Sequence, residues 1–296
     1  MKLLCATDLL SGSDAAVERA YQLRDALGAT LSLVHVVPPL SSAEGTLEQR
    51  LLSASGRLVQ HARHTGEGAE LVVRCGRPAA VVAEEARNAH LIVVGPHEAE
   101  KFSGGMRGNF LERLLPASRS PILVARRPGR EAYRRLLLAL DGSSSTAQVV
   151  RAAERMPLGS DPAFAVVHAH EPPYEAMMTT SGVGNLSVAT YASASMSQAA
   201  AMIHSQLRLH SLDWRRYRVL LMDARPPLAV RQAMLETAPD LLVLGTRGHG
   251  RFRRAILGST AHEVLRTANC DVLLVPEASM RESRQPGPED PGPAAA

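Results

Sequence analysis

Residues 241–275 read LLVLGTRGHGRFRRAILGSTAHEVLRTANCDVLLV, and this stretch decides the fold. An apolar strand ends at Gly245, a second glycine follows at Gly248, and Gly258-Ser259-Thr260 opens a new helix after nine more residues. Glycines let backbone N–H groups approach an anion closely, and a helix N-terminus adds further N–H donors and a favourable dipole. The stretch therefore predicts a phosphate-binding loop between a strand and a helix.

The same frame occurs about 150 residues earlier, so the chain contains an internal repeat. Strand-like segments match in pairs at Lys2–Asp8 and Arg135–Asp141, Leu33–Val36 and Val166–Ala169, Leu71–Arg74 and Val219–Met222, Leu91–Gly95 and Leu241–Gly245, and Ile122–Ala125 and Val272–Val275. The offset grows from 133 in the first two pairs to 150 in the last two. Most extra residues of the second copy therefore lie between its second and third strands.

Helical segments such as Ala15–Leu27 and Ala79–Asn88 separate these strands. Apolar strands that alternate with helices indicate βαβ units, a parallel sheet and helices on both of its faces. We therefore predict an α/β fold of two doubly wound domains, each with a parallel five-stranded sheet. The predicted units are domain 1 at residues 1–126, a linker at 127–132, domain 2 at 133–276, and a Pro- and Gly-rich disordered tail at 277–296.

Residues 175–197 fall outside the regular pattern of the second copy. The segment EAMMTTSGVGNLSVATYASASMS is rich in Ser, Thr, Met and Gly and has no clear period. We predict a mobile surface loop, with a flap over a ligand as the alternative.

Composition narrows the class of protein and its partners. The chain is 45% hydrophobic and only 3% aromatic, which is typical of a globular protein with an aliphatic core. A net charge of +4, without basic runs interleaved with aromatics, disfavours nucleic acid as a partner. No stretch reaches the roughly eighteen apolar residues of a membrane span, so we expect no membrane partner.

The cysteines and the N-terminus predict a cytoplasmic location. Asp8 interrupts the first apolar run too early for a signal peptide. Cys5, Cys75 and Cys270 are scattered without metal-ligand spacing, and we interpret them as small apolar fillers in a reducing compartment.

The spacing Gly245-x2-Gly248-x9-Gly258-Ser259-Thr260 is similar to the ATP-binding signature of the universal stress protein family. The segments ATDLLSGSDAAVERA (6–20) and ALDGSSSTAQVVRAA (139–153) look like that family's first strand and turn. The resemblance spans both repeats, at about 1–126 and 133–276, so the chain looks like a tandem member. It implies a Rossmann-like, adenine nucleotide alpha hydrolase-like fold and a role in the stress response.

The resemblance also implies the residues of an ATP site in domain 2, with ATP bound alone or with Mg²⁺. Asp141 would contact the ribose or the adenine edge, and the backbone of Ala169 would read adenine. The remaining implied binding residues, which hold or flank ribose and phosphates, are Gly245, Arg247, Gly248, His249, Gly258, Ser259 and Thr260. Ala139 departs from the pattern, because ATP-binding members often carry proline there.

The first copy has lost the residues of this loop. Glu98 stands in place of Gly248, Glu100 adds a second carboxylate, and Asn109-Phe110 replace Ser259-Thr260. Two carboxylates repel a triphosphate, and phenylalanine offers no hydrogen-bond donor. We therefore predict that domain 1 does not bind a nucleotide in the ordinary way, although a different ligand stays open.

The leading hypothesis is an ATP-binding regulatory protein of the stress response. The sequence offers no convincing nucleophile–base pair and no carboxylate cluster for a catalytic metal, so we expect no catalysis beyond slow ATP hydrolysis. An ATP-consuming pyrophosphatase or adenylyl-transfer enzyme on the same fold remains an alternative, as does an interaction module that needs no nucleotide. We interpret His35 and His168 as hydrogen-bonded buried imidazoles within strands.

The fifth strands are expected to lie at sheet edges, which tend to find partners. In the family these strands pair between domains, so the resemblance implies that the two repeats dock as an internal pseudo-dimer. Whether two chains then form a homodimer is left open by the sequence.

Overall fold

The structure, a computed structural model, describes residues 1–39, 46–96, 110–129, 131–170, 175–181, 184–246 and 258–276. The elements of the first repeat are β1 (Lys2–Ala6), α1 (Asp14–Leu27), β2 (Thr30–Val37), α2 (Leu47–Thr65), β3 (Glu70–Cys75), α3 (Pro78–Glu85), β4 (Leu91–Val94), α4 (Phe110–Ala117) and β5 (Ile122–Val124). The elements of the second repeat are β6 (Tyr133–Ala139), α5 (Thr146–Glu154), β7 (Leu158–Ala169), α6 (Glu175–Thr180), α7 (Asn185–His210), β8 (Tyr217–Met222), α8 (Pro226–Thr237), β9 (Leu241–Gly245), α9 (Ser259–Thr267) and β10 (Asp271–Val275).

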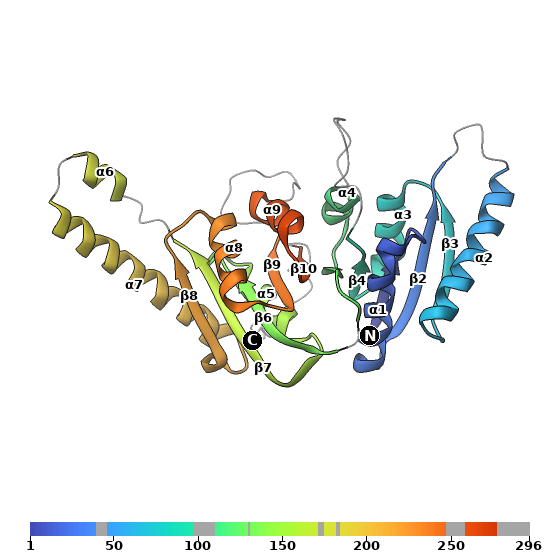
Figure 1. The fold of residues 1–296 in the computed structure, drawn as a ribbon, viewed down its shortest axis with the longest axis horizontal. Helices are drawn as coiled ribbons and strands as arrows, with labels where there is room; N and C mark the ends of the chain where they lie inside the picture. Colours follow the sequence, from blue (N-terminus) through green and yellow to red (C-terminus); the bar gives the residue numbers. More distant parts are fainter. Residues whose placement is uncertain are drawn as a thin grey trace, which may run out of the picture.

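Within these residues, ten strands form one sheet in the order β3-β2-β1-β4-β5-β10-β9-β6-β7-β8 (Figure 1). Each repeat contributes five parallel strands, as predicted. The two sheets are not separate, however, because β5 pairs antiparallel with β10, with Leu123 opposite Leu273. The expected pairing of the fifth strands is therefore confirmed, and it merges two five-stranded sheets into one.

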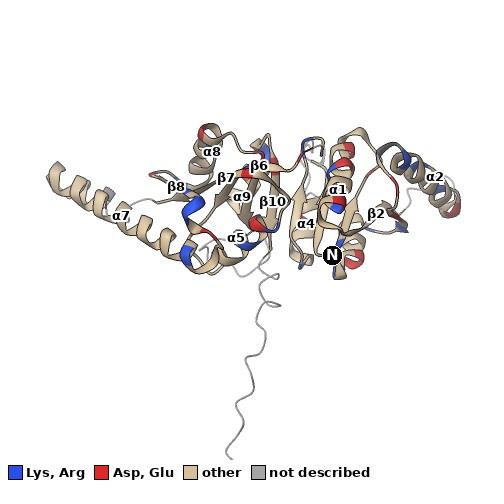
Figure 2. Cartoon of the chain, turned by 90° about the horizontal axis from the view of Figure 1, so that it is seen from below, with Lys and Arg blue, Asp and Glu red and all other residues tan. Residues whose placement is uncertain are grey.

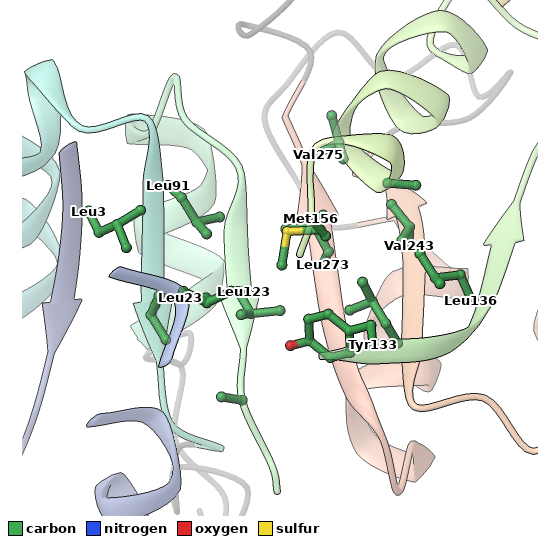
Figure 3. Close-up of a cluster of buried hydrophobic side chains, with 14 of the residues drawn as sticks. Leu3, Leu23, Leu91, Leu123, Tyr133, Leu136, Met156, Val243, Leu273 and Val275 are labelled. Atoms are coloured by element: carbon green, nitrogen blue, oxygen red, sulfur yellow. The ribbon is translucent and has the colours of Figure 1, made fainter. Parts of the chain in front are cut away.

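Both faces of the sheet are buried, which explains why its strands are almost continuously apolar. Successive residues alternate between the two faces, so Leu3 belongs to one core and Leu4 to the other. One core packs against α1, α2, α5 and α7, and the other packs against α3, α4, α8 and α9. Figure 3 shows the first core, where side chains of both repeats lie on one side of the shared sheet.

Helices replace the loop that we predicted at 175–197, so that prediction is wrong. Helix α6 covers Glu175–Thr180, and α7 runs from Asn185 to His210. The part of α7 that packs on the core carries Ala199, Ile203 and Leu207 at helical spacing, beyond the end of the predicted loop. The earlier part of α7 extends away from the sheet (Figure 1), and no charged residue occurs between 185 and 207 (Figure 2).

A buried cluster of polar groups fastens the two repeats at the β5–β10 seam. Asp271 is fully buried, and its Oδ2 lies 3.0 Å from Arg19 Nε of the first repeat. The Tyr133 hydroxyl donates to the same oxygen at 2.7 Å, while the N–H groups of Arg126 and Arg127 donate to Oδ1 at 2.8 and 3.2 Å. Burial and the neighbouring Asp271 raise the pKa of Tyr133 well above 10, so this hydroxyl stays a donor.

Two further expectations concern membranes and the tail. None of the helices in the described part of the chain is long and apolar enough to cross a membrane. The tail predicted at 277–296 and the loop at 247–257 lie outside the described residues.

Candidate functional site

The carboxyl ends of β6, β7 and β9 lie side by side at one edge of the second repeat. Ala139, the last residue of β6, pairs with Leu244 of β9 on one side and with Val167 of β7 on the other. The chain leaves β6 towards β7 and later returns to β9 on the opposite side, so the strand order reverses between β6 and β9. In open parallel sheets such a switch point is where ligands bind.

The turn after β6 is shaped by Asp141 and Gly142. The N–H of Leu140 continues the ladder by donating to the Val167 carbonyl at 3.0 Å, and Asp141 Oδ1 then accepts from the Ser143 N–H at 3.0 Å. Gly142 has a φ of +75°, in the left-handed region that favours glycine. The structure therefore places the Asp141 carboxylate at the predicted edge, directly beyond Ala139.

The end of β7 holds Ala169 beside two histidines. Ala169 pairs with Met222 of β8, and the neighbouring His168 uses Nδ1 to donate to the Leu140 carbonyl at 2.8 Å. In the first repeat His35 makes the same 2.8 Å bond to the Thr7 carbonyl. The imidazole of His168 is buried, as predicted, whereas that of His35 is only half-buried and lines a cavity of the first repeat.

The loop that follows β9 is closed by backbone hydrogen bonds at its ends. The N–H of Thr246 donates to the Val275 carbonyl at 3.1 Å, and the N–H of Gly258 donates to the Thr246 carbonyl at 3.3 Å. Helix α9 begins at Ser259, so Ser259 and Thr260 form its first turn beside the end of β9. The structure thus brings Gly245, Gly258, Ser259 and Thr260 to one place, whereas Arg247, Gly248 and His249 lie outside the described residues.

Nothing among the described residues, which exclude the loop at 247–257, requires a glycine at position 258. Gly258 has a φ of −58°, which any residue adopts, and an added Cβ would make only ordinary contact with the Thr246 carbonyl oxygen at 3.5 Å. Neither backbone strain nor crowding by the described neighbours therefore accounts for this glycine. Close approach of a bound group to the start of α9 would account for it.

Helix α7 borders the same edge, which the sequence interpretation missed. Ser195 Oγ is hydrogen-bonded to His170 Nε2 at 2.8 Å, one residue beyond the end of β7. Met202 lies against Gly142, where an added Cβ would come within 2.5 Å of its sulfur. Gly142 was the available signal, because a glycine directly after the strand-ending Asp141 indicates a strained or crowded turn.

The corresponding edge of the first repeat encloses a cavity of about 310 Å³ at the ends of β1, β2 and β4. Asp8 Oδ1 accepts from the Leu10 N–H at 2.9 Å and from the Ser13 hydroxyl. Phe110, the first residue of α4 and the counterpart of Thr260, lines the cavity. The remaining substitutions that the sequence singled out, Glu98, Glu100 and Asn109, lie outside the described residues.

The cysteines play two different structural roles. Burial raises the pKa of the Cys5 thiol to about 12, and burial together with Asp271 raises that of Cys270 to about 11. Both are neutral apolar fillers, as predicted, and unsuited to nucleophilic chemistry. Cys75 is exposed at the end of β3, so the prediction of a buried filler is wrong there.

Comparisons with known proteins, by sequence and by structure, all find relatives in the same family. The model of the universal stress protein family matches residues 1–126 and 132–276. A universal stress protein of Thermus aquaticus is 29% identical over 143 residues, and the match covers 48% of this chain and 98% of the relative. A universal stress protein of Synechocystis sp. is 26% identical over 184 residues, and the match covers 62% of this chain and 56% of the relative. The crystal structure of a universal stress protein from Archaeoglobus fulgidus superposes with a TM-score of 0.66 at 18% identity, over 93% of this chain and 98% of that one, and shows the same fold.

Proposed function

The chain belongs to the universal stress protein family in both of its repeats, and from this premise we propose that it is a regulatory protein of the stress response whose second repeat binds ATP. The nucleotide would lie across the carboxyl ends of β6, β7 and β9. Its phosphates would meet the start of α9, and its base would lie towards the end of β7.

The observation that carries the proposal is the start of α9. Gly258 leaves room that its described neighbours do not fill, and Ser259 and Thr260 place two hydroxyl groups in the first helical turn. A helix N-terminus attracts anions through its N–H groups and its dipole. Asp141, at the end of the neighbouring strand, is an acceptor for sugar hydroxyl groups.

At the position that corresponds to Thr260, the described part of the first repeat offers no hydroxyl group for a phosphate. Phe110 stands there, its side chain has no hydrogen-bond donor, and it instead forms part of an apolar cavity wall. We therefore propose one nucleotide per chain. The edges of β5 and β10 are already paired with each other, so these edges are not available to a second copy of the protein.

We propose a binding role and no dedicated chemistry, with the protein acting in the cytoplasm. The buried thiols of Cys5 and Cys270 have raised pKa values, and the Ser195–His170 pair is a single hydrogen bond at the rim of the site. A bound ATP, alone or with Mg²⁺, would serve as a signal that the protein carries.

The first experiment identifies the small molecule released when the purified full-length protein is denatured. We expect one adenine nucleotide per chain, or stoichiometric binding of added ATP to nucleotide-free protein by calorimetry, with and without Mg²⁺. Two nucleotides per chain would contradict the assignment of domain 1, and the absence of both released and added nucleotide would contradict the whole proposal.

A matched pair of glycine substitutions separates binding from folding. Because the fold accommodates a Cβ at 258, Gly258→Ala should leave the unfolding transition unchanged and weaken ATP binding by about tenfold, as expected for a side chain that blocks close approach. Gly56→Ala, in the middle of α2, should leave ATP binding unchanged. Equal affinity in both variants would contradict the placement of phosphate at α9.

The competing functions predict different results from the same protein. Rapid release of AMP and pyrophosphate that depends on a second substrate would favour an ATP-consuming enzyme. Partner binding that stays unchanged when Gly248→Glu removes nucleotide binding would favour an interaction module.

A further inference from the structure

The cavity of the first repeat is a candidate binding site in its own right. It has a volume of about 310 Å³, at the lower end of the range of about 300–1,000 Å³ that is typical of small-molecule pockets. It lies between β1 and β4, where the strand order of the first repeat reverses. Such switch points bind ligands in open α/β sheets.

The walls of this cavity are largely apolar. Val82 of α3, Val94 of β4, two flanking prolines (Pro38 and Pro78) and the ring of Phe110 form most of them. Among the described lining residues there is no lysine and no arginine, whereas Asp8 contributes a carboxylate. Such a lining favours an uncharged ligand and disfavours a phosphate, because burying an unpaired anion beside a carboxylate is unfavourable.

The polar groups of the lining act mainly as hydrogen-bond acceptors. The Thr7 carbonyl can only accept, so the 2.8 Å contact places the proton of the His35 imidazole on Nδ1. The other ring nitrogen, Nε2, is then an acceptor in the neutral ring. The Ser13 hydroxyl is already donated to the Asp8 carboxylate, which as a carboxylate can only accept. A ligand that donates a hydrogen bond therefore suits this lining.

We propose that domain 1 binds a compact, uncharged heteroaromatic molecule that carries an N–H donor and no phosphate, with His35 Nε2 as its acceptor. A cavity of about 310 Å³ lies at the small end of the range for ligand pockets, which suits a compact ring system. Phe110 and the valines supply the apolar contacts, and His35 fixes the orientation. The site is separate from the proposed nucleotide site of domain 2 and does not depend on it.

The test titrates indole, an uncharged bicyclic ring with one N–H, into the full-length protein with excess ATP present. Calorimetry or ligand-observed NMR should show saturable binding of one indole per chain. Benzofuran, in which an oxygen replaces the N–H, should bind about tenfold more weakly, as expected for the loss of one hydrogen bond. AMP should not displace indole. A lack of saturable indole binding, equal affinity for benzofuran, or displacement by AMP would each overturn the proposal.

Matched substitutions in the two repeats locate the site. His35→Phe should lower the affinity for indole about tenfold and remove the preference for indole over benzofuran. His168→Phe loses the equivalent 2.8 Å bond in domain 2 and should change neither the affinity for indole nor this preference. Val82→Phe should fill the cavity and abolish binding, and Val230→Phe, at the corresponding position of α8, should not. Equal effects within either pair would overturn the proposal. If Val82→Phe fails to fold, the histidine pair decides the question.

Discussion

The two repeats have the same strand order, but they differ at the turn that follows the first strand. In the second repeat Gly142 adopts a φ of +75°, and the sulfur of Met202 packs against it. In the first repeat the corresponding residue, Leu9, adopts a φ of +61° although it carries a side chain. The fold therefore imposes a left-handed backbone at this position in both repeats. In the second repeat a glycine, which has no β-carbon, adopts this conformation without strain.

The helices that cover these two turns also differ in the residue that contacts the turn. Ala54, Leu58 and Ala62 of α2 are buried with the same spacing as Ala199, Ile203 and Leu207 of α7, which aligns the two helices. On that alignment Arg57, which donates to the Leu9 carbonyl at 3.2 Å, corresponds to Met202. The turn after the first strand is thus covered by a charged residue in the first repeat and by an uncharged residue in the second.

The seam between the repeats is equally asymmetric. Asp271 is the first residue of β10 in the second repeat, and Pro121 occupies the corresponding position directly before β5, so only one repeat supplies the buried carboxylate. Its ion-pair partner Arg19 comes from the first repeat, whose counterpart in α5 is Ala152. Duplication of one fold therefore produced complementary rather than identical halves.

The largest expected effect comes from removing that carboxylate. Asp271→Ala leaves the Arg19 guanidinium buried without its anion and two backbone N–H groups without their acceptor, and should lower the free energy of unfolding by about 3–5 kcal/mol. Urea denaturation measures this change. The control Glu236→Ala breaks the exposed ion pair with Arg218 and should cost at most about 1 kcal/mol. Similar losses in the two variants would show that the seam is not held by Asp271.

The next effect tests the two helix starts by exchanging their residues. Thr260→Phe places in α9 the residue that α4 has at the corresponding position. The protein then loses one hydroxyl group that donates to the charged phosphates, which should weaken ATP binding by about 10–100-fold. Calorimetry with ATP measures the affinity. The reciprocal change Phe110→Thr should leave the affinity of the protein for ATP unchanged. A larger effect of the change at 110 than of the change at 260 would reverse the assignment of the two repeats.

A smaller effect is expected from giving the second repeat the turn residue of the first. Gly142→Leu places a β-carbon against the Met202 sulfur in a left-handed backbone, and should lower the free energy of unfolding by about 2 kcal/mol. Thermal and urea unfolding report the loss. The double variant Gly142→Leu with Met202→Ala should recover part of it by removing the clash. No recovery would mean that backbone strain alone accounts for the change.

The smallest effect compares the two covering helices. Gly56 lies inside α2, an added Cβ there meets nothing within 4 Å, and the aligned residue of α7 is Ala201. Gly56→Ala should therefore raise the free energy of unfolding by about 0.5–1 kcal/mol, because glycine is the weaker helix former. Ala201→Gly should produce a loss of similar size. A destabilised Gly56→Ala variant would contradict the alignment of the two helices.

Much of the fold followed from local sequence patterns. Apolar strands at matching offsets predicted the repeat and the five parallel strands of each half, and glycine spacing indicated the loop beside α9. The loop predicted at 175–197 was wrong because the residues that anchor α7, Ala199, Ile203 and Leu207, lie beyond that segment. Ser195 and Met202 were also missed, because their contacts with His170 and Gly142 join residues far apart in sequence.

The sequence by itself determined the repeated α/β frame, the residues at the ends of its strands and the difference between Thr260 and Phe110. These features depend on local periodicity and residue type. Only the tertiary structure decided the antiparallel register of β5 and β10, the contact of Asp271 with Arg19 across the seam, and the partly open cavity of the first repeat that Phe110 lines. Such features arise from packing between distant segments, because burial and hydrogen-bond partners exist only once the chain has folded.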